Sequence, residues 1–172
     1  MLIAYSGGVD SSLLLKAVKD ACIQALAVTV VTELIPPEEA THAMAVAGRL
    51  GLRHQVESLN ILGEDCFVRN PKDRCYHCKN TIMGRLKEIC KAYGLAHVIE
   101  GSNLDDLGDW RPGMKALKEL GIKSPFLEAG IGKAEIRTIS RALGLDTWDR
   151  PSSPCLATRF YYGYCITKEA LQ

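Results

Sequence analysis

The stretch Ser6-Gly7-Gly8-Val9-Asp10-Ser11-Ser12 decides the fold of this chain, because it joins an apolar run at residues 2–5 to a helical pattern. Glycines in such a loop let the backbone adopt positive φ and turn its N–H groups toward one point, and the following helix adds free N–H groups and its dipole. The sequence therefore predicts an anion-binding loop after the first strand. The alternative is an ordinary glycine turn between a strand and a helix.

Length and composition predict one small-molecule-binding domain over residues 1–172. A chain of 172 residues with 47% hydrophobic residues can bury a single core. Its net charge is +1, with 21 basic and 20 acidic residues well mixed. Such a balance provides no strong field for nucleic acid or an anionic membrane, so we expect neither as a partner.

The cysteines and the first residues predict a cytoplasmic protein. The chain has seven cysteines, an odd number, and begins directly in a strand without a basic region or a cleavage site. This pattern favours free thiols in a reducing compartment. The longest apolar run, at residues 25–31, is too short to cross a bilayer.

Glycines that follow helical patterns predict an alternation of helices and strands. Four such segments end in a glycine followed by an apolar residue, as in a Schellman motif: Gly51, Gly94, Gly121 and Gly144. Helices are expected over residues 10–22 and from Pro37 and Lys133. Short apolar runs at residues 24–31, 54–59, 97–100 and 124–128 join the run at residues 2–5. The predicted fold class is α/β and Rossmann-like, a parallel five-stranded sheet with helices on both faces.

Cys155 is the candidate nucleophile. It lies in a proline-stiffened loop, between Pro154 and Arg159, within a region rich in Pro, Ser and Tyr at residues 146–172 that we expect to form active-site loops. A partly exposed thiol near positive charge should have a lowered pKa and more thiolate. The alternative is a small buried thiol without chemistry.

Cys75 and Cys78 open another predicted helix, and three interpretations stay open for them. A zinc or iron–sulfur site needs four ligands, and no second C-x-x-C completes the set. A redox pair is the second interpretation, because helix N-termini stabilise thiolates. The third is a helix start that lines the nucleotide pocket.

Polar residues after the strand at residues 97–100 are candidates for binding phosphate and metal. Asp106 and Asp10 could hold Mg²⁺ against phosphates, since magnesium takes a few oxygen ligands and keeps several waters. The alternative for the aspartates at 105 and 106 is helix capping. Arg111 could bind a phosphate or a carboxylate in a bidentate manner.

Taken together, these motifs resemble known enzymes. The glycine loop lacks the lysine of the common ATPase loop and resembles the PP-loop of ATP pyrophosphatases, which hold the β,γ-pyrophosphate and leave the α-phosphate open to attack. Nearly the whole chain resembles the LarE family of ATP-dependent sacrificial sulfur transferases, in the adenine nucleotide α-hydrolase (HUP-type) group. The marks of this family are residues 6–12 (SGGVDSS), 74–79 (RCYHCK), 101–106 (GSNLDD), 111–113 (RPG), 124–130 (SPFLEAG), 154–159 (PCLATR) and 162–163 (YG).

The resemblance implies a reaction. Such enzymes transfer AMP from ATP to a carboxylate of pyridinium-3,5-biscarboxylic acid mononucleotide, and a cysteine at the position of Cys155 then gives up its sulfur and becomes dehydroalanine. The product serves the nickel-pincer cofactor of lactate racemase. The cofactors implied are ATP and Mg²⁺. The ATP-binding residues implied are Ser6, Gly7, Gly8, Val9, Asp10, Ser11, Ser12, Gly101 and Asn103; substrate would contact Arg111, Thr158 and Arg159, and Asp10 and Asp106 would hold the metal.

The chain also departs from the family. Members usually have residues ahead of the first strand and a C-terminal region that carries oligomer contacts, so the resemblance implies either a fragment or a degenerate form of an enzyme that is a homo-oligomer at full length. Some relatives bind an iron–sulfur cluster through three clustered cysteines, but near Cys155 the sequence shows only Cys165. The alternative functions are tRNA thiolation by a PP-loop enzyme and an inactive nucleotide-binding fragment.

Overall fold

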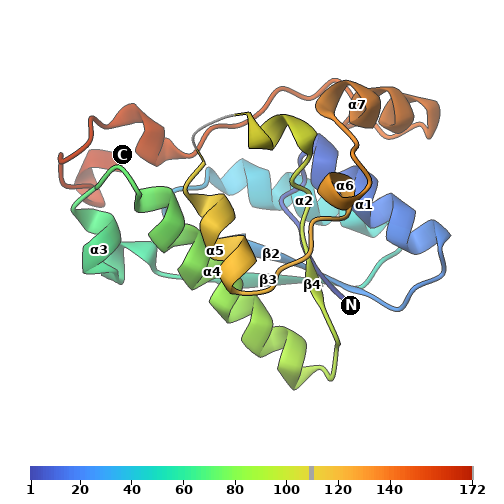
Figure 1. Ribbon diagram of the computed structural model, residues 1–172, viewed down its shortest axis with the longest axis horizontal. Coiled ribbons are helices and arrows are strands. Elements are labelled where there is room, and N and C mark those ends of the chain that lie inside the picture. Colours follow the sequence, from blue (N-terminus) through green and yellow to red (C-terminus); the bar gives the residue numbers. More distant parts are fainter. Residues whose placement is uncertain (109–110, 172) are drawn as a thin grey trace.

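The computed structural model describes residues 1–108 and 111–171 and shows a parallel sheet between helices (Figure 1). Its strand order is β3-β2-β1-β4. The strands are β1 (Leu2–Ala4), β2 (Leu26–Val31), β3 (His54–Ser58) and β4 (Val98–Ile99). The α-helices are α1 (Val9–Asp20), α2 (Pro37–Leu50), α3 (Asp65–Val68), α4 (Arg74–Ala92), α5 (Gly113–Glu119), α6 (Pro125–Glu128) and α7 (Lys133–Ala142). Short 3₁₀ helices are η1 (Ile61–Gly63), η2 (Leu104–Leu107), η3 (Leu156–Arg159) and η4 (Glu169–Leu171).

Helices cover both faces of the sheet, as predicted. Successive strand residues point to opposite faces, so Ile3 packs in the core with α1, α2 and α7, while Leu2 packs in the core with α4 and α5. The two layers of helices lie on either side of the sheet in Figure 1. Because β1 is buried from both sides, the loop that follows it has a rigid base.

The strand order places the glycine loop at a topological switch point. From β1 the chain crosses to β2 and β3 on one side and later returns to pair β4 with the other edge of β1. In open α/β sheets, ligands bind at the carboxyl ends of strands where the winding direction reverses. The loop at residues 6–12 follows β1 at this point.

The prediction of a fifth strand at residues 124–128 is wrong. Among the described residues the sheet has four strands, and only Lys123 forms a further parallel bridge, to Ile99. Pro125 explains the difference, because it lacks an N–H for a strand ladder and its fixed φ suits the first turn of a helix. Helix α6 accordingly begins at Pro125.

The helix boundaries agree closely with the pattern of glycines. Helices α2 and α7 begin at Pro37 and Lys133 as predicted. All four predicted capping glycines have left-handed φ, between 63° and 68°. Helix α1 ends at Asp20, two residues short of the predicted end, and Cys22 beyond it has φ 54°. Local signals therefore set the helix ends to within two residues.

The last part of the chain runs back to α3 as a largely irregular segment (Figure 1). Ile166 N donates to Val68 O at 3.0 Å, and both Ile166 and Ala157 are buried with Phe67 in a third apolar cluster. The segment that carries Cys155 is thus packed on the molecule. Of the helices in the described part of the chain, none has both the length and the apolar character needed to span a bilayer.

Candidate active site

The glycine loop packs so closely against α2 that no larger residue fits at Gly7. Gly7 has φ +77°, and a Cβ added there would lie 2.9 Å from the Cβ of Ala43 in α2. Gly8 then caps α1 with extended backbone and without a side-chain hydrogen bond to the first turn. The N–H groups of that first turn are therefore oriented, with the helix dipole, toward the space in front of the loop.

The serines of the loop divide into two roles. Ser11 Oγ donates to Gly8 O at 3.2 Å and lies 3.1 Å from Ser6 Oγ, so these hydroxyls line the loop. Ser12 is fully buried, and its Oγ lies 3.3 Å from the hydroxyl of Tyr5. Burial raises the pKa of Tyr5, and the Ser12 contact opposes this shift. The side chain of Ser12 thus supports the core, and so does Val9, which leaves these two residues only their backbone for binding.

The end of β4 meets the first turn of α1 at the same place. A Cβ at Gly101 would lie 3.1 Å from Ser11 N, so a larger residue there would push α1 away by a few tenths of an ångström. Asn103 Nδ2 donates to Asp10 Oδ1 at 3.3 Å. The structure therefore brings together the predicted nucleotide residues at 6–12, Gly101 and Asn103.

Lys133 is a member of this site that sequence reasoning missed. Its Nζ donates to Asp10 Oδ2 at 2.5 Å, and its backbone N donates to Asp105 Oδ2 at 2.6 Å. The residue opens α7 after Gly132, and this position at a predicted helix start was the available signal. The loop after β1 contains no lysine, but the fold provides one from a distant helix.

The two predicted metal ligands lie on either side of Asn103. Asp10 accepts from the Asn103 side chain, and Asp106 Oδ2 accepts from Asn103 N at 2.9 Å in a capping box. Asp106 also pairs with Arg111 at 2.6 Å. No group of three or more His, Cys, Asp or Glu side chains within the described ranges is arranged to hold a metal ion. Each of the two carboxylates is paired with a cationic side chain, Asp10 with Lys133 and Asp106 with Arg111.

A buried carboxylate, Glu100, fastens the same edge of the sheet. Its oxygens accept from Ser102 Oγ at 2.7 Å and from Ser124 Oγ at 2.5 Å. Lys79 Nζ of α4 lies 3.9 Å from Glu100 Oε2. Glu100 thereby ties β4 to α6 and to the helix that carries Cys75 and Cys78.

The structure brings three thiols into electrostatic contact that the sequence left apart. Burial, together with the nearby thiols of Cys155 and Cys75, raises the pKa of Cys78 to about 12. Cys78 also packs against the apolar cluster that contains Ala157. The thiols of Cys155, Cys75 and Cys78 are therefore close enough to interact electrostatically.

The predicted lowering of the Cys155 pKa is wrong. Although the residue is exposed, the packed protein around the thiol removes water from it, and this burial raises the pKa of Cys155. A backbone hydrogen bond from Ala157 and the charge of Arg74 oppose the rise. The arginine that acts on the thiol is therefore Arg74 of α4.

The two predicted substrate-binding residues near Cys155, Thr158 and Arg159, are both exposed but differ in their hydrogen bonds. Thr158 Oγ1 donates to Cys155 O at 2.7 Å and so stabilises the turn after the thiol, while the residue itself is exposed. Arg159 is exposed at the end of η3. Across the described residues, no hydrogen bond or ion pair joins Cys155 to residues 6–12, and a substrate would have to bridge them.

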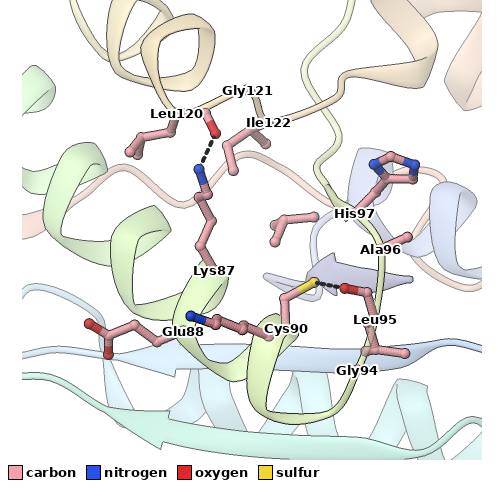
Figure 2. A pocket seen from close by; sticks show the side chains of 12 residues that line it. Lys87, Glu88, Cys90, Gly94, Leu95, Ala96, His97, Leu120, Gly121 and Ile122 are labelled. Atoms are coloured by element: carbon pink, nitrogen blue, oxygen red, sulfur yellow. Dashed lines mark hydrogen bonds between the residues drawn. The ribbon is translucent and has the colours of Figure 1, made fainter.

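A cavity of about 750 Å³ lies at the opposite edge of the sheet (Figure 2). Its walls come from the end of α4, the start of β4 and the end of α5. Two hydrogen bonds join residues of these walls: Lys87 Nζ donates to Leu120 O, and Cys90 Sγ donates to Leu95 O. Ligands of this architecture bind at the carboxyl ends of strands, so we do not assign the nucleotide here. A smaller cavity of about 250 Å³ borders Asp105 and Lys133 on the side of the glycine loop.

Comparison with known proteins identifies relatives over nearly the whole chain. No family model matches. The chain is 46% identical to an uncharacterized protein of Synechocystis sp. over 172 residues, 99% of the chain and 64% of that protein. It is 33% identical to an uncharacterized protein of Methanocaldococcus jannaschii over 172 residues, 100% of the chain and 65% of that protein.

A third relative has a stated activity in its name. The chain is 36% identical to the pyridinium-3,5-bisthiocarboxylic acid mononucleotide synthase of Lactiplantibacillus plantarum over 169 residues, 97% of the chain and 61% of that protein. The chain thus spans 61% to 65% of the length of these relatives. In structure it resembles the NMN synthetase of Francisella tularensis, with a TM-score of 0.67 at 14% identity over 88% of the chain and 65% of that protein. The resemblance predicted from the motifs is thereby confirmed: over 97% of its length the chain is homologous to LarE, the pyridinium-3,5-bisthiocarboxylic acid mononucleotide synthase, and its fold resembles that of NMN synthetase.

Proposed function

We propose that this chain is the catalytic part of an ATP-dependent sulfur transferase. It adenylates a carboxylate of pyridinium-3,5-biscarboxylic acid mononucleotide, releases pyrophosphate and transfers the sulfur of Cys155 to the activated carbon. The product class is the thiocarboxylate used in nickel-pincer cofactor biosynthesis. The observation that carries the proposal is the convergence of the glycine loop, Asp10, Asn103 and Lys133 at the switch point of the sheet.

The adenylation step uses the groups around the glycine loop. The first-turn N–H groups of α1 and the hydroxyls of Ser6 and Ser11 would hold the β- and γ-phosphates, with Lys133 Nζ as the cation. Asp10 and Asp106 would hold Mg²⁺, which neutralises phosphate charge when bound. A triphosphate held by its end leaves the α-phosphorus open to the incoming carboxylate. Arg111, beside Asp106, would contact the anionic substrate.

Transfer of sulfur requires the acyl adenylate, because a free carboxylate has no good leaving group. The thiolate of Cys155 attacks the acyl carbon, a C–S bond forms, and the C–O bond to AMP breaks with its electron pair leaving on AMP. A base then removes the Cα proton of Cys155, and the Cβ–S bond breaks. The thiocarboxylate leaves with the sulfur, and Cys155 becomes dehydroalanine. Because burial raises the pKa of Cys155, a bound substrate or base must help form the thiolate.

The mass of the protein after turnover tests this proposal. With ATP, Mg²⁺ and the dicarboxylate substrate, the peptide that contains Cys155 should lose one H₂S, about 34 Da, as the Cβ–S bond breaks. A Cys165→Ser variant is the matched control, because Cys165 is exposed on the same segment and should not affect the loss. Turnover with an unchanged mass of that peptide would contradict the sacrificial route.

The electrostatic interaction of Cys155 with Cys75 and Cys78 raises a second route, in which a bound cluster replaces the sulfur. The donor set does not fit such a group, because no three Cys, His, Asp or Glu side chains of the described part of the chain are arranged around one metal position. We therefore propose the sacrificial route. Iron content of the anaerobically purified protein distinguishes the two routes, and stoichiometric iron would favour the second.

Two further experimental outcomes would favour a different function for this chain. Salt-sensitive binding of tRNA would favour tRNA thiolation, because phosphate contacts are screened by ions. An increase in melting temperature with ATP, without release of pyrophosphate, would indicate a nucleotide-binding module.

A further inference from the structure

A buried polar pair, Asn70 and Arg74, fastens the loop that carries Cys155 to the start of α4. Asn70 has no exposed surface and φ 50°. Its Nδ2 donates to Tyr161 O at 2.8 Å, and its backbone O accepts from Gly163 N at 2.8 Å. Arg74 is 6% exposed, and its Nη1 donates to Asn70 Oδ1 at 2.7 Å. We call Asn70 and Arg74 the loop clamp.

A second set of contacts holds the same loop at the clamp. The guanidinium of Arg74 lies over the ring of Tyr162, with 4.7 Å between Cζ and the ring centroid. Ile166 is buried against α3, and its N donates to Val68 O. The segment over residues 155–166 cannot leave α4 without exposing Asn70 or separating the guanidinium from its ring.

The charge of Arg74 is not cancelled at this position. Within the described ranges Arg74 has no ion pair with a carboxylate, and its partners are a neutral amide and an aromatic ring. Burial of a cation without a counter-ion costs free energy of folding. At this position the charge of Arg74 acts on the Cys155 thiol and favours its thiolate form. Burial and the thiol of Cys75 raise the pKa of Cys155. The backbone hydrogen bond of Ala157 and the charge of Arg74 lower it.

We propose that Arg74 and Asn70 are positioning residues for Cys155: Asn70 sets the place of the loop, and Arg74 holds Asn70 and supplies positive charge to the thiol. The proposal rests on the proposed function of Cys155 as the sulfur donor. It accounts for a left-handed, fully buried asparagine whose side chain and backbone both bind the same loop.

Alkylation of Cys155 tests the charge of Arg74 without any turnover. The rate of iodoacetamide labelling of the Cys155 peptide is measured by mass spectrometry between pH 6 and pH 10. In Arg74→Met the midpoint of this pH profile should rise, and labelling at pH 7.5 should slow by about three-fold, because the thiolate loses a nearby cation. Arg85→Met, which removes an exposed guanidinium from the same helix, is the matched control and should leave the profile unchanged.

Hydrogen exchange tests the place of the loop. Asn70→Gly suits the left-handed backbone and removes only the side chain, so exchange over residues 155–166 should become at least about three-fold faster in a protein that still folds. Arg74→Lys keeps a charge but not the planar donor group, so its alkylation midpoint should stay nearer that of the natural chain while exchange rises. Tyr162→Leu, at an exposed ring, should raise exchange in the same segment without unfolding.

The outcomes separate this proposal from the proposed function. An unchanged midpoint in Arg74→Met, or unchanged exchange in Asn70→Gly, would overturn the loop clamp. If Arg74→Met fails to fold, Arg74→Lys and Asn70→Gly decide. A protein that shows both effects but never loses sulfur from Cys155 keeps the clamp and refutes only the sulfur transfer.

Discussion

Asp10 has two partners at the start of α1, and both come from residues far along the chain. Asn103 donates to one carboxylate oxygen and Lys133 to the other. Lys133 is 123 residues away in sequence, so its place at the glycine loop depends on the packing of α7 against α1. The lysine of this site comes from another helix, whereas the common ATPase loop carries its own lysine.

Replacement of Lys133 should weaken the binding of ATP. A charge-assisted hydrogen bond to phosphate is worth about 1.5–3 kcal/mol, so Lys133→Met should raise the ATP concentration for half-maximal pyrophosphate release about ten-fold or more. Lys16→Met is the matched control, because Lys16 pairs with Asp20 on the exposed side of α1. Equal ATP dependence in the two variants would show that Lys133 serves only Asp10.

At the scale of elements, two close approaches position the site. The glycine loop lies on α2 at Gly7, and the end of β4 lies on α1 at Gly101. These contacts join β1, α1, α2 and β4 into one rigid edge. The same packing that builds the core thus orients the backbone donors of the loop.

A methyl group at Gly7 should destabilise the fold. Gly7→Ala combines a left-handed φ with a Cβ 2.9 Å from that of Ala43, so the free energy of unfolding should fall. We expect a loss of about 2 kcal/mol or more in urea denaturation.

Gly84→Ala is the opposite case. Gly84 lies inside α4 with nothing within 4 Å of an added Cβ, and the change should stabilise by about 0.5–1 kcal/mol. Similar effects of the two changes would contradict the tight packing of the loop.

At the scale of the whole molecule, stability should depend on pH through a histidine between strands. His54 Nε2 of β3 lies 2.8 Å from Thr29 Oγ1 of β2, and Thr29 donates to Tyr5 O. The ring of His54 meets the edge of the Tyr5 ring at 5.8 Å between centroids. These contacts join β3, β2 and the residue that follows β1, so protonation of His54 affects several parts of the sheet.

Acidification should therefore lower the free energy of unfolding. Burial lowers the pKa of His54 in the folded state, and burial with the charge of Arg150 lowers that of His42. The unfolded chain then binds more protons below an unfolded pKa of about 6.5, so stability is full above that pH and falls as pH drops through it. Urea midpoints at pH 7.5 and pH 5.5 measure this, and His54→Gln should reduce the difference between them. A midpoint that rises at pH 5.5 would contradict the shift.

The sequence by itself determined the elements whose signals are local. The glycine pair after an apolar run indicates the anion loop, and glycines at 51, 94, 121 and 144 mark helix ends, because left-handed backbone is a property of single residues. The motifs also indicated the resemblance to LarE, which the comparison with the Lactiplantibacillus plantarum protein confirms. The prediction of a fifth strand was wrong because Pro125 favours the first turn of a helix, although the residues around it are apolar.

Only the tertiary structure decided how distant residues meet. It brought Lys133 to Asp10, turned the side chain of Ser12 into the core, and placed Cys155 within electrostatic reach of Cys75, Cys78 and Arg74. It also reversed the expected shift of the Cys155 pKa, because that shift depends on how much water the packed neighbours exclude. Contacts, burial and electrostatic fields join residues across the whole chain, and no local pattern encodes them.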